Sequence, residues 1–103
     1  MELNNEIHQG DILKVEKIGS PVIVVSKDFF NSSGEIIGCP VFKNNTESPL
    51  HIYIETDEVS GYAQCEKLAL LDLDVRGYKK VDKLLLADII NITDAIQGIF
   101  DYI

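Results

Sequence analysis

The chain has 103 residues, of which 46% are hydrophobic and 25% are charged. These values are typical of a globular protein with a single core, and they exclude a large multidomain enzyme. Lys and Arg number 9 against 17 for Asp and Glu, so the formal net charge is -8, and Arg76 is the one arginine. A surface this acidic disfavours nonspecific binding of nucleic acid, which normally depends on many Lys and Arg contacts.

The sequence carries no targeting or membrane signal. Residues 1–6 lack the basic and apolar regions of a secretory signal, and no stretch reaches the ~18 uninterrupted apolar residues of a membrane span. We therefore expect a cytoplasmic protein without membrane contact. Cys39 and Cys65 show neither C-x-x-C spacing nor a partner histidine, so we expect buried small hydrophobic side chains, no metal site and no cofactor.

Short strand-like segments fill the first two thirds of the chain. They are rich in β-branched residues or alternate between apolar and polar residues, and turn residues such as Gly19, Ser20 and Pro21 separate them. The predicted strands lie within residues 10–17, 22–25, 35–41, 51–55, 62–67 and 68–71. Because no helix long enough for a parallel crossover lies between them, an antiparallel sheet rolled into a small barrel is expected.

The last segment of the chain has a helical period. Its main apolar stripe, spaced four and three residues apart, consists of Leu85, Ile89, Ile92, Ile96, Ile99 and Ile103. Asp82 is the expected N-cap, which predicts a helix over about residues 82–102. The expected fold is therefore mainly β with a C-terminal helix, in one domain over residues 1–103 with its barrel at about 7–72. The stripe is either intramolecular core or a dimer interface.

The order of these features resembles the MazF/PemK family. Residues 10–12 (Gly-Asp-Ile) open the first strand, 21–26 (Pro-Val-Ile-Val-Val-Ser) form the second, 36–40 the third and 51–54 the fourth, before an amphipathic end helix. The resemblance covers about residues 7–103. It implies an SH3-like barrel of the MazF/CcdB type, a homodimer, an endoribonuclease toxin that cuts single-stranded RNA, and a cognate antitoxin that neutralises it.

Several positions depart from the family pattern. The family has an arginine before the second-strand proline, where it stabilises charge on the scissile phosphate, and this chain has Ser20. The family has Thr or Ser after the third strand for proton transfer, and this chain reads Pro-Val-Phe-Lys over 40–43. In the stretch 67–70, Ala69 and Leu70 stand where the family has a basic residue followed by a hydroxyl, and the loop over 17–20 is short. The resemblance therefore implies a retained fold with a diverged active site.

Few residues can supply a rebuilt catalytic site. Ser20 occupies the arginine position, Lys43 lies beside the lost hydroxyl, and His51 can act as a base near neutral pH. Lys27, at the exit of the second strand, and Lys67, on a strand that lines the family's groove, are candidates for RNA contact. For each of them, a solvated edge residue is the alternative interpretation.

A second group of candidate RNA-binding residues surrounds Tyr78. Arg76, Lys79, Lys80 and Lys83 lie within eight residues and form the main basic cluster of the sequence. Such a cluster can contact phosphate while the tyrosine ring stacks on a base. The alternative interpretation is that these charged residues only face solvent at the start of the C-terminal helix.

Two functions follow from the family resemblance and its departures. One is an mRNA interferase toxin with a diverged site, and the other is a non-catalytic binding module that keeps the dimer and its partner groove. A third possibility is a gyrase poison, because residues 92–103 are similar to the end helix of CcdB, although Asp101 and Tyr102 replace its Trp-Gly. The net charge predicts an antitoxin that is less acidic, or basic, where it docks.

Overall fold

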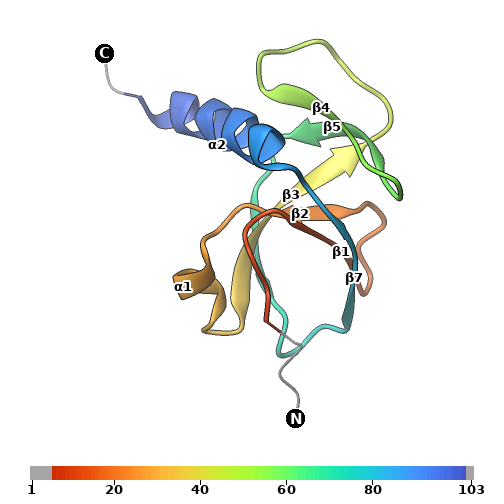
Figure 1. The fold of residues 1–103 in the computed structure, drawn as a ribbon, viewed down its shortest axis with the longest axis vertical. Helices are drawn as coiled ribbons and strands as arrows, with labels where there is room; N and C mark the ends of the chain where they lie inside the picture. Colours follow the sequence, from red (N-terminus) through yellow and green to blue (C-terminus); the bar gives the residue numbers. More distant parts are fainter. Residues whose placement is uncertain (1–5, 102–103) are drawn as a thin grey trace.

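A computed structural model describes residues 6–101. Its strands are β1 (Asp11–Val15), β2 (Val22–Val24), β3 (Glu35–Phe42), β4 (His51–Glu55), β5 (Ser60–Gln64), β6 (Ala69–Asp72) and β7 (Tyr78–Lys83). The two helices are α1 (Asp28–Asn31) and α2 (Leu86–Phe100). Every strand pairing is antiparallel, which confirms the predicted class, mainly β with a C-terminal helix (Figure 1).

The sheet is organised around the long strand β3. The strands of the sheet follow the order β4-β5-β3-β2-β1-β7, and β6 also pairs with β3. The first half of β3 pairs with β6, where Ile36 lies opposite Leu71, and its end pairs with β5, where Val41 lies opposite Ala63. Among residues 6–101, no pairing joins β7 to β4 or β6, so the sheet curls as a barrel without closing.

Two apolar clusters occupy the two sides of the central strands. Ile12 and Ile23 belong to the cluster that also contains Ile92 of α2, whereas their neighbours Leu13 and Val22 belong to the other cluster. Successive strand residues point to opposite faces, so β1 and β2 contribute to both clusters. Strand β2 is therefore buried on both faces. Each such side chain contributes about 1.5–3 kcal/mol through burial.

The start of the C-terminal helix differs from the prediction. Residues 78–83 form β7, and Asp82 pairs with Ile12 instead of capping a helix. The Asp82 carboxylate accepts the backbone N–H of Glu58 at 3.1 Å, and the N–H of Leu84 donates to the Gly10 carbonyl at 2.9 Å. These bonds keep the chain extended, so α2 begins only at Leu86. It ends at Phe100, and the predicted last helical residue, 102, and the last stripe residue, Ile103, lie outside the described range.

The two cysteines are core residues, as predicted. Cys39 and Cys65 are free thiols with no exposed surface. A hydrogen bond with Cys65, together with burial, raises the pKa of the Cys39 thiol. This thiol is therefore neutral and unreactive at physiological pH.

Neither helix within residues 6–101 is long and apolar enough to span a membrane.

Candidate functional site

A cleft lies between the β1–β2 connection and the end of β3. Strand pairing places these segments side by side, because Val22 lies opposite Pro40 and the N–H of Val41 donates to the Pro21 carbonyl at 2.9 Å. The cleft has a volume of about 450 Å³. It is lined by Gly19, Ser20, Pro21, Val41, Phe42, Lys43 and Asn44. The structure thus brings the predicted catalytic residues Ser20 and Lys43 into one cleft.

Lys67 adds a second cation next to this cleft. Its Nζ lies over the Phe42 ring at 5.1 Å from the ring centroid, in a cation–π contact. Phe42 pairs with Tyr62 in β5, and the chain turns back after Gln64, whose carbonyl accepts the N–H of Lys67 at 2.9 Å. Phe42 therefore connects Lys67 to the cleft that holds Lys43. Two ammonium groups, an aromatic ring and the Ser20 hydroxyl suit a phosphate and a stacked base.

His51 is held by acceptors on both ring nitrogens. Its Nε2 lies 2.8 Å from a carboxylate oxygen of Glu66, and its Nδ1 lies 3.0 Å from the Asn45 side-chain oxygen and also contacts the Thr46 carbonyl. The Glu66 hydrogen bond is the main cause that raises the pKa of His51, and desolvation opposes it. The doubly protonated ring fits these partners, because both nitrogens then donate. A base role would require Nε2 to separate from Glu66.

This pairing was not anticipated from the sequence. In the sequence, no spacing identifies a partner for Glu66, and Phe42 is an apolar residue in the stretch where the family has a hydroxyl. The register of the β4–β5 hairpin explains the pairing. His51 lies directly opposite Gln64, and Glu66 comes two residues after Gln64. Diagonal neighbours at this spacing lie within reach of long side chains.

The other predicted RNA-binding residues lie away from the cleft. Lys27 precedes α1, at the end of β2 that is remote from Ser20, and it is exposed. Within residues 6–101, no group of three or more His, Cys, Asp or Glu side chains is arranged to hold a metal ion.

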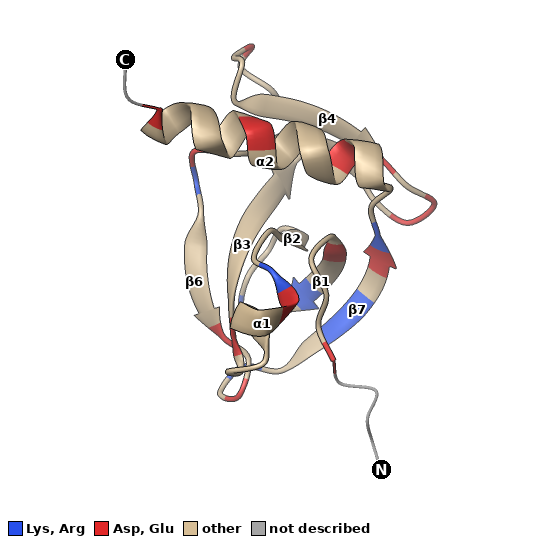
Figure 2. Ribbon diagram, turned by 60° about the vertical axis from the view of Figure 1, so that its left-hand side comes forward, with Lys and Arg blue, Asp and Glu red and all other residues tan. Residues whose placement is uncertain are grey.

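The basic residues around Tyr78 lie on or beside the edge strand β7 (Figure 2). Two of them have internal partners: Lys80 Nζ lies 3.2 Å from a carboxylate oxygen of the buried Asp11, and Arg76 donates to the Glu16 carbonyl at 3.3 Å. Lys79 and Lys83 are exposed. The predicted cluster is therefore partly engaged in holding β7 against β1.

Comparison with known proteins identifies the family. The family model described as PemK-like, MazF-like toxin of type II toxin-antitoxin system matches residues 9–100. The chain belongs to this toxin family. No curated protein matches the sequence. The family match confirms the resemblance drawn from the strand motifs, and neither a gyrase poison nor a non-toxin module gains support from it.

Solved structures share the fold at low sequence identity. One is a MazE-MazF crystal structure from Deinococcus radiodurans, with 17% identity, a TM-score of 0.85, and coverage of 94% of this chain and 98% of that one. Another is an endoribonuclease from a mycobacterial species, with 16% identity, a TM-score of 0.82, and coverage of 96% and 95%. These likenesses establish the MazF fold over nearly the whole chain.

Proposed function

We propose that this toxin acts on single-stranded RNA, which it binds in the cleft formed by Ser20, Phe42 and Lys43. The observation that carries the proposal is that Lys43 lines the same cleft as Phe42 and that Lys67 lies over the Phe42 ring, in a chain with a net charge of -8. Two cations attract a phosphodiester, and the aromatic ring beside them stacks on a base. Proteins bind single strands through this combination of contacts. Lysines bind phosphate as point charges, so they take the place of the absent arginine without its planar fork.

Cleavage of the bound strand makes further demands on the cleft. The reaction needs stabilisation of charge on the phosphate and groups that transfer protons. Lys43 supplies charge and Ser20 supplies a hydroxyl, whereas both nitrogens of His51 are occupied. This occupancy favours a second candidate function, a toxin-family module that binds RNA or a partner without cutting it.

We also infer that the toxin is a cytoplasmic homodimer with a cognate antitoxin. Relatives of the same fold support the antitoxin, since they include MazE-MazF complexes from Deinococcus radiodurans and a mycobacterial endoribonuclease in complex with its cognate antitoxin. Exposed apolar side chains on α2 support a contact surface, because Leu86, Ile90 and Phe100 are 70%, 47% and 74% exposed. Apolar residues gathered on one surface mark interaction sites.

Binding and cleavage of a labelled single-stranded RNA of mixed sequence test the proposal. The purified protein is compared with Lys43→Ala, Lys67→Ala and His51→Ala variants. Loss of a charged contact to phosphate is expected to weaken binding about tenfold for each lysine variant. Lys14→Ala is the matched control, because Lys14 is an exposed lysine on β1 that does not line the cleft.

The outcomes separate the two functions. Cleavage that is lost in Lys43→Ala identifies an interferase with a rebuilt site. Binding without cleavage identifies the non-catalytic module. Absence of RNA binding by the unmodified protein, or equal weakening by Lys14→Ala and Lys43→Ala, overturns the assignment of the cleft.

A further inference from the structure

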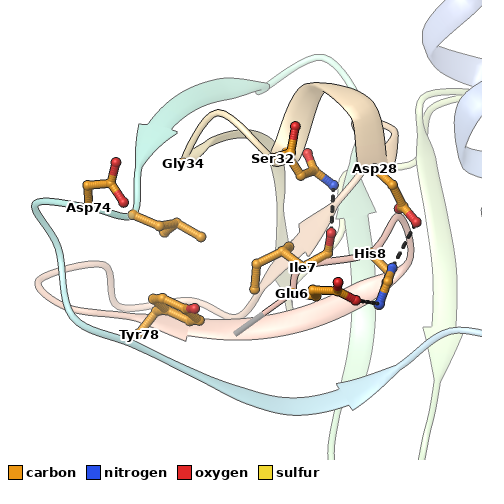
Figure 3. A pocket seen from close by; sticks show the side chains of 10 residues that line it. Glu6, Ile7, His8, Asp28, Ser32, Gly34, Asp74 and Tyr78 are labelled. Atoms are coloured by element: carbon orange, nitrogen blue, oxygen red, sulfur yellow. Dashed lines mark hydrogen bonds and ion pairs between the residues drawn. The ribbon is translucent and has the colours of Figure 1, made fainter. Parts of the chain in front are cut away.

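We propose that a second cavity, at the other end of β3 from the RNA cleft, binds a basic peptide segment of a partner protein. This mouth cavity has a volume of about 770 Å³ and lies between the segment before β1, helix α1 and the β6–β7 connection (Figure 3). Its size falls within the range of roughly 300–1,000 Å³ that is typical of ligand pockets. No part of the proposed RNA cleft lines it.

The floor of the mouth cavity is apolar. Ile7 and Leu73 line it and belong to the apolar cluster that contains Leu13, each with 9% of its surface exposed. Tyr78 packs against the same cluster and presents its ring to the cavity from β7. Figure 3 shows Ile7 and Tyr78 lying between Asp74 on one side and Asp28 on the other. The apolar part of a ligand side chain that enters this cavity is shielded from water. The protein need not rearrange to shield it, because the apolar floor is already formed.

The rim of the mouth cavity is acidic on both sides. Glu6 and Asp28 share His8, whose Nδ1 lies 2.8 Å from Asp28 and whose Nε2 lies 3.6 Å from Glu6. Asp74, across the cavity, lies against Gly34, where an added Cβ would come within 2.3 Å of its carboxylate oxygen. No Lys or Arg within residues 6–101 lines the cavity. The rim therefore holds three carboxylates and one histidine, so it carries net negative charge.

An apolar floor between acidic edges is complementary to lysine and arginine side chains. These residues bury their methylene stems on apolar surface and keep a charged head in polar surroundings. Because Asp74 and Asp28 lie on opposite sides of the cavity, the fitting ligand is a short segment with a basic residue near each end and an apolar residue between them. RNA phosphates are repelled by the same carboxylates, so the two sites differ in their ligands. This inference does not depend on RNA binding at the cleft.

The test uses a fluorescent pentapeptide with arginine at both ends and leucine in the middle, and the same peptide with citrulline in place of arginine. Fluorescence anisotropy is measured with the unmodified protein, Asp74→Asn, and Asp94→Asn as the charge-matched control. Asp94 is exposed on α2 and does not line the mouth cavity. The arginine peptide is expected to bind, and Asp74→Asn to weaken it about three- to fivefold, as for a surface ion pair.

Equal binding of the arginine and citrulline peptides to the unmodified protein overturns the proposal without any variant. Equal weakening by Asp94→Asn and Asp74→Asn overturns it as well, because the attraction is then the general charge of the molecule. Undetectable binding of the arginine peptide at low salt also contradicts it. RNA binding measured on Asp74→Asn is expected to be unchanged, which keeps a failure here distinct from a failure of the proposed function.

Discussion

At the scale of single residues, the His51–Glu66 pair connects two segments near the candidate RNA cleft. The His51 side chain is 9% exposed and bridges the end of β5 to the loop before β4. That loop also carries Lys43, which lines the cleft. Ser20 and Lys43 could be predicted as members of one site, because each lies beside a strand that is recognisable in the sequence. The contacts of Glu66 and Lys67 could not, because they depend on where the chain turns after β5.

The first prediction concerns the pH dependence of this pair. The pKa of His51 is raised above its ordinary value of 6.5, and the pKa of Glu66 is lowered below 4.5. The His51 contribution to stability is therefore complete below 6.5 and is lost as pH rises through its folded-state pKa. The Glu66 contribution is present above 4.5 and is lost as pH falls through its own folded-state pKa.

An NMR titration of the His51 ring checks this prediction. Glu66→Gln is expected to lower the His51 pKa toward its ordinary value and to remove the associated pH dependence of the urea midpoint. Glu58→Gln is the control, since Glu58 is exposed and, among residues 6–101, only its backbone N–H is hydrogen-bonded. An unchanged His51 pKa in Glu66→Gln would contradict the role assigned to the pair.

At the scale of elements, the sequence predicts best where burial enforces a pattern. The strands at 11–15, 22–24 and 35–42 are recognisable because their apolar residues face the two core clusters. Strand β7 was missed because its sequence is polar and its pairing with β1 shifts between Ile12 and Leu13, which hides any alternation. Helix α1 spans only Asp28–Asn31, too short for a periodic signal.

Two glycines, Gly61 in β5 and Gly98 in α2, test how tightly these two elements are packed. A Cβ at Gly61 in β5 would lie 2.7 Å from the Phe42 carbonyl oxygen, a backbone atom that cannot rotate away. Gly61→Ala is therefore expected to destabilise the fold by about 1–3 kcal/mol. A Cβ at Gly98 in α2 meets nothing within 4 Å, so Gly98→Ala is expected to stabilise the helix by about 0.5–1 kcal/mol. Urea unfolding measures both, and a Gly61→Ala protein as stable as the original would refute the packing argument.

At the scale of the whole molecule, the arrangement of charge matters more than its sum. A net charge of -8 alone argues against RNA, yet the fold places Lys43 in a cleft with Lys67 next to it over Phe42, and it places Glu6, Asp28 and Asp74 around another cavity. Composition could reveal the excess of acid but not this separation, because the residues of each site come from distant parts of the chain.

The salt dependence of RNA binding follows from this arrangement. For single strands, the logarithm of the binding constant falls with the logarithm of salt concentration by about 0.7 per phosphate neutralised, so two lysines predict a slope of about −1.4. Lys67→Ala is expected to reduce the slope to about −0.7. Anisotropy titrations over a range of salt concentrations measure this, and a slope steeper than about −3 would indicate that the cations of β7 also bind RNA.

Mapping where RNA touches the protein tests the central claim most directly. In amide NMR spectra recorded with a short single-stranded RNA, the largest shifts are expected at Ser20, at Phe42 to Asn44, and at Lys67. Shifts confined to Lys79–Lys83 on β7, or no shifts at an RNA concentration that saturates binding in anisotropy, would contradict the assignment of the cleft.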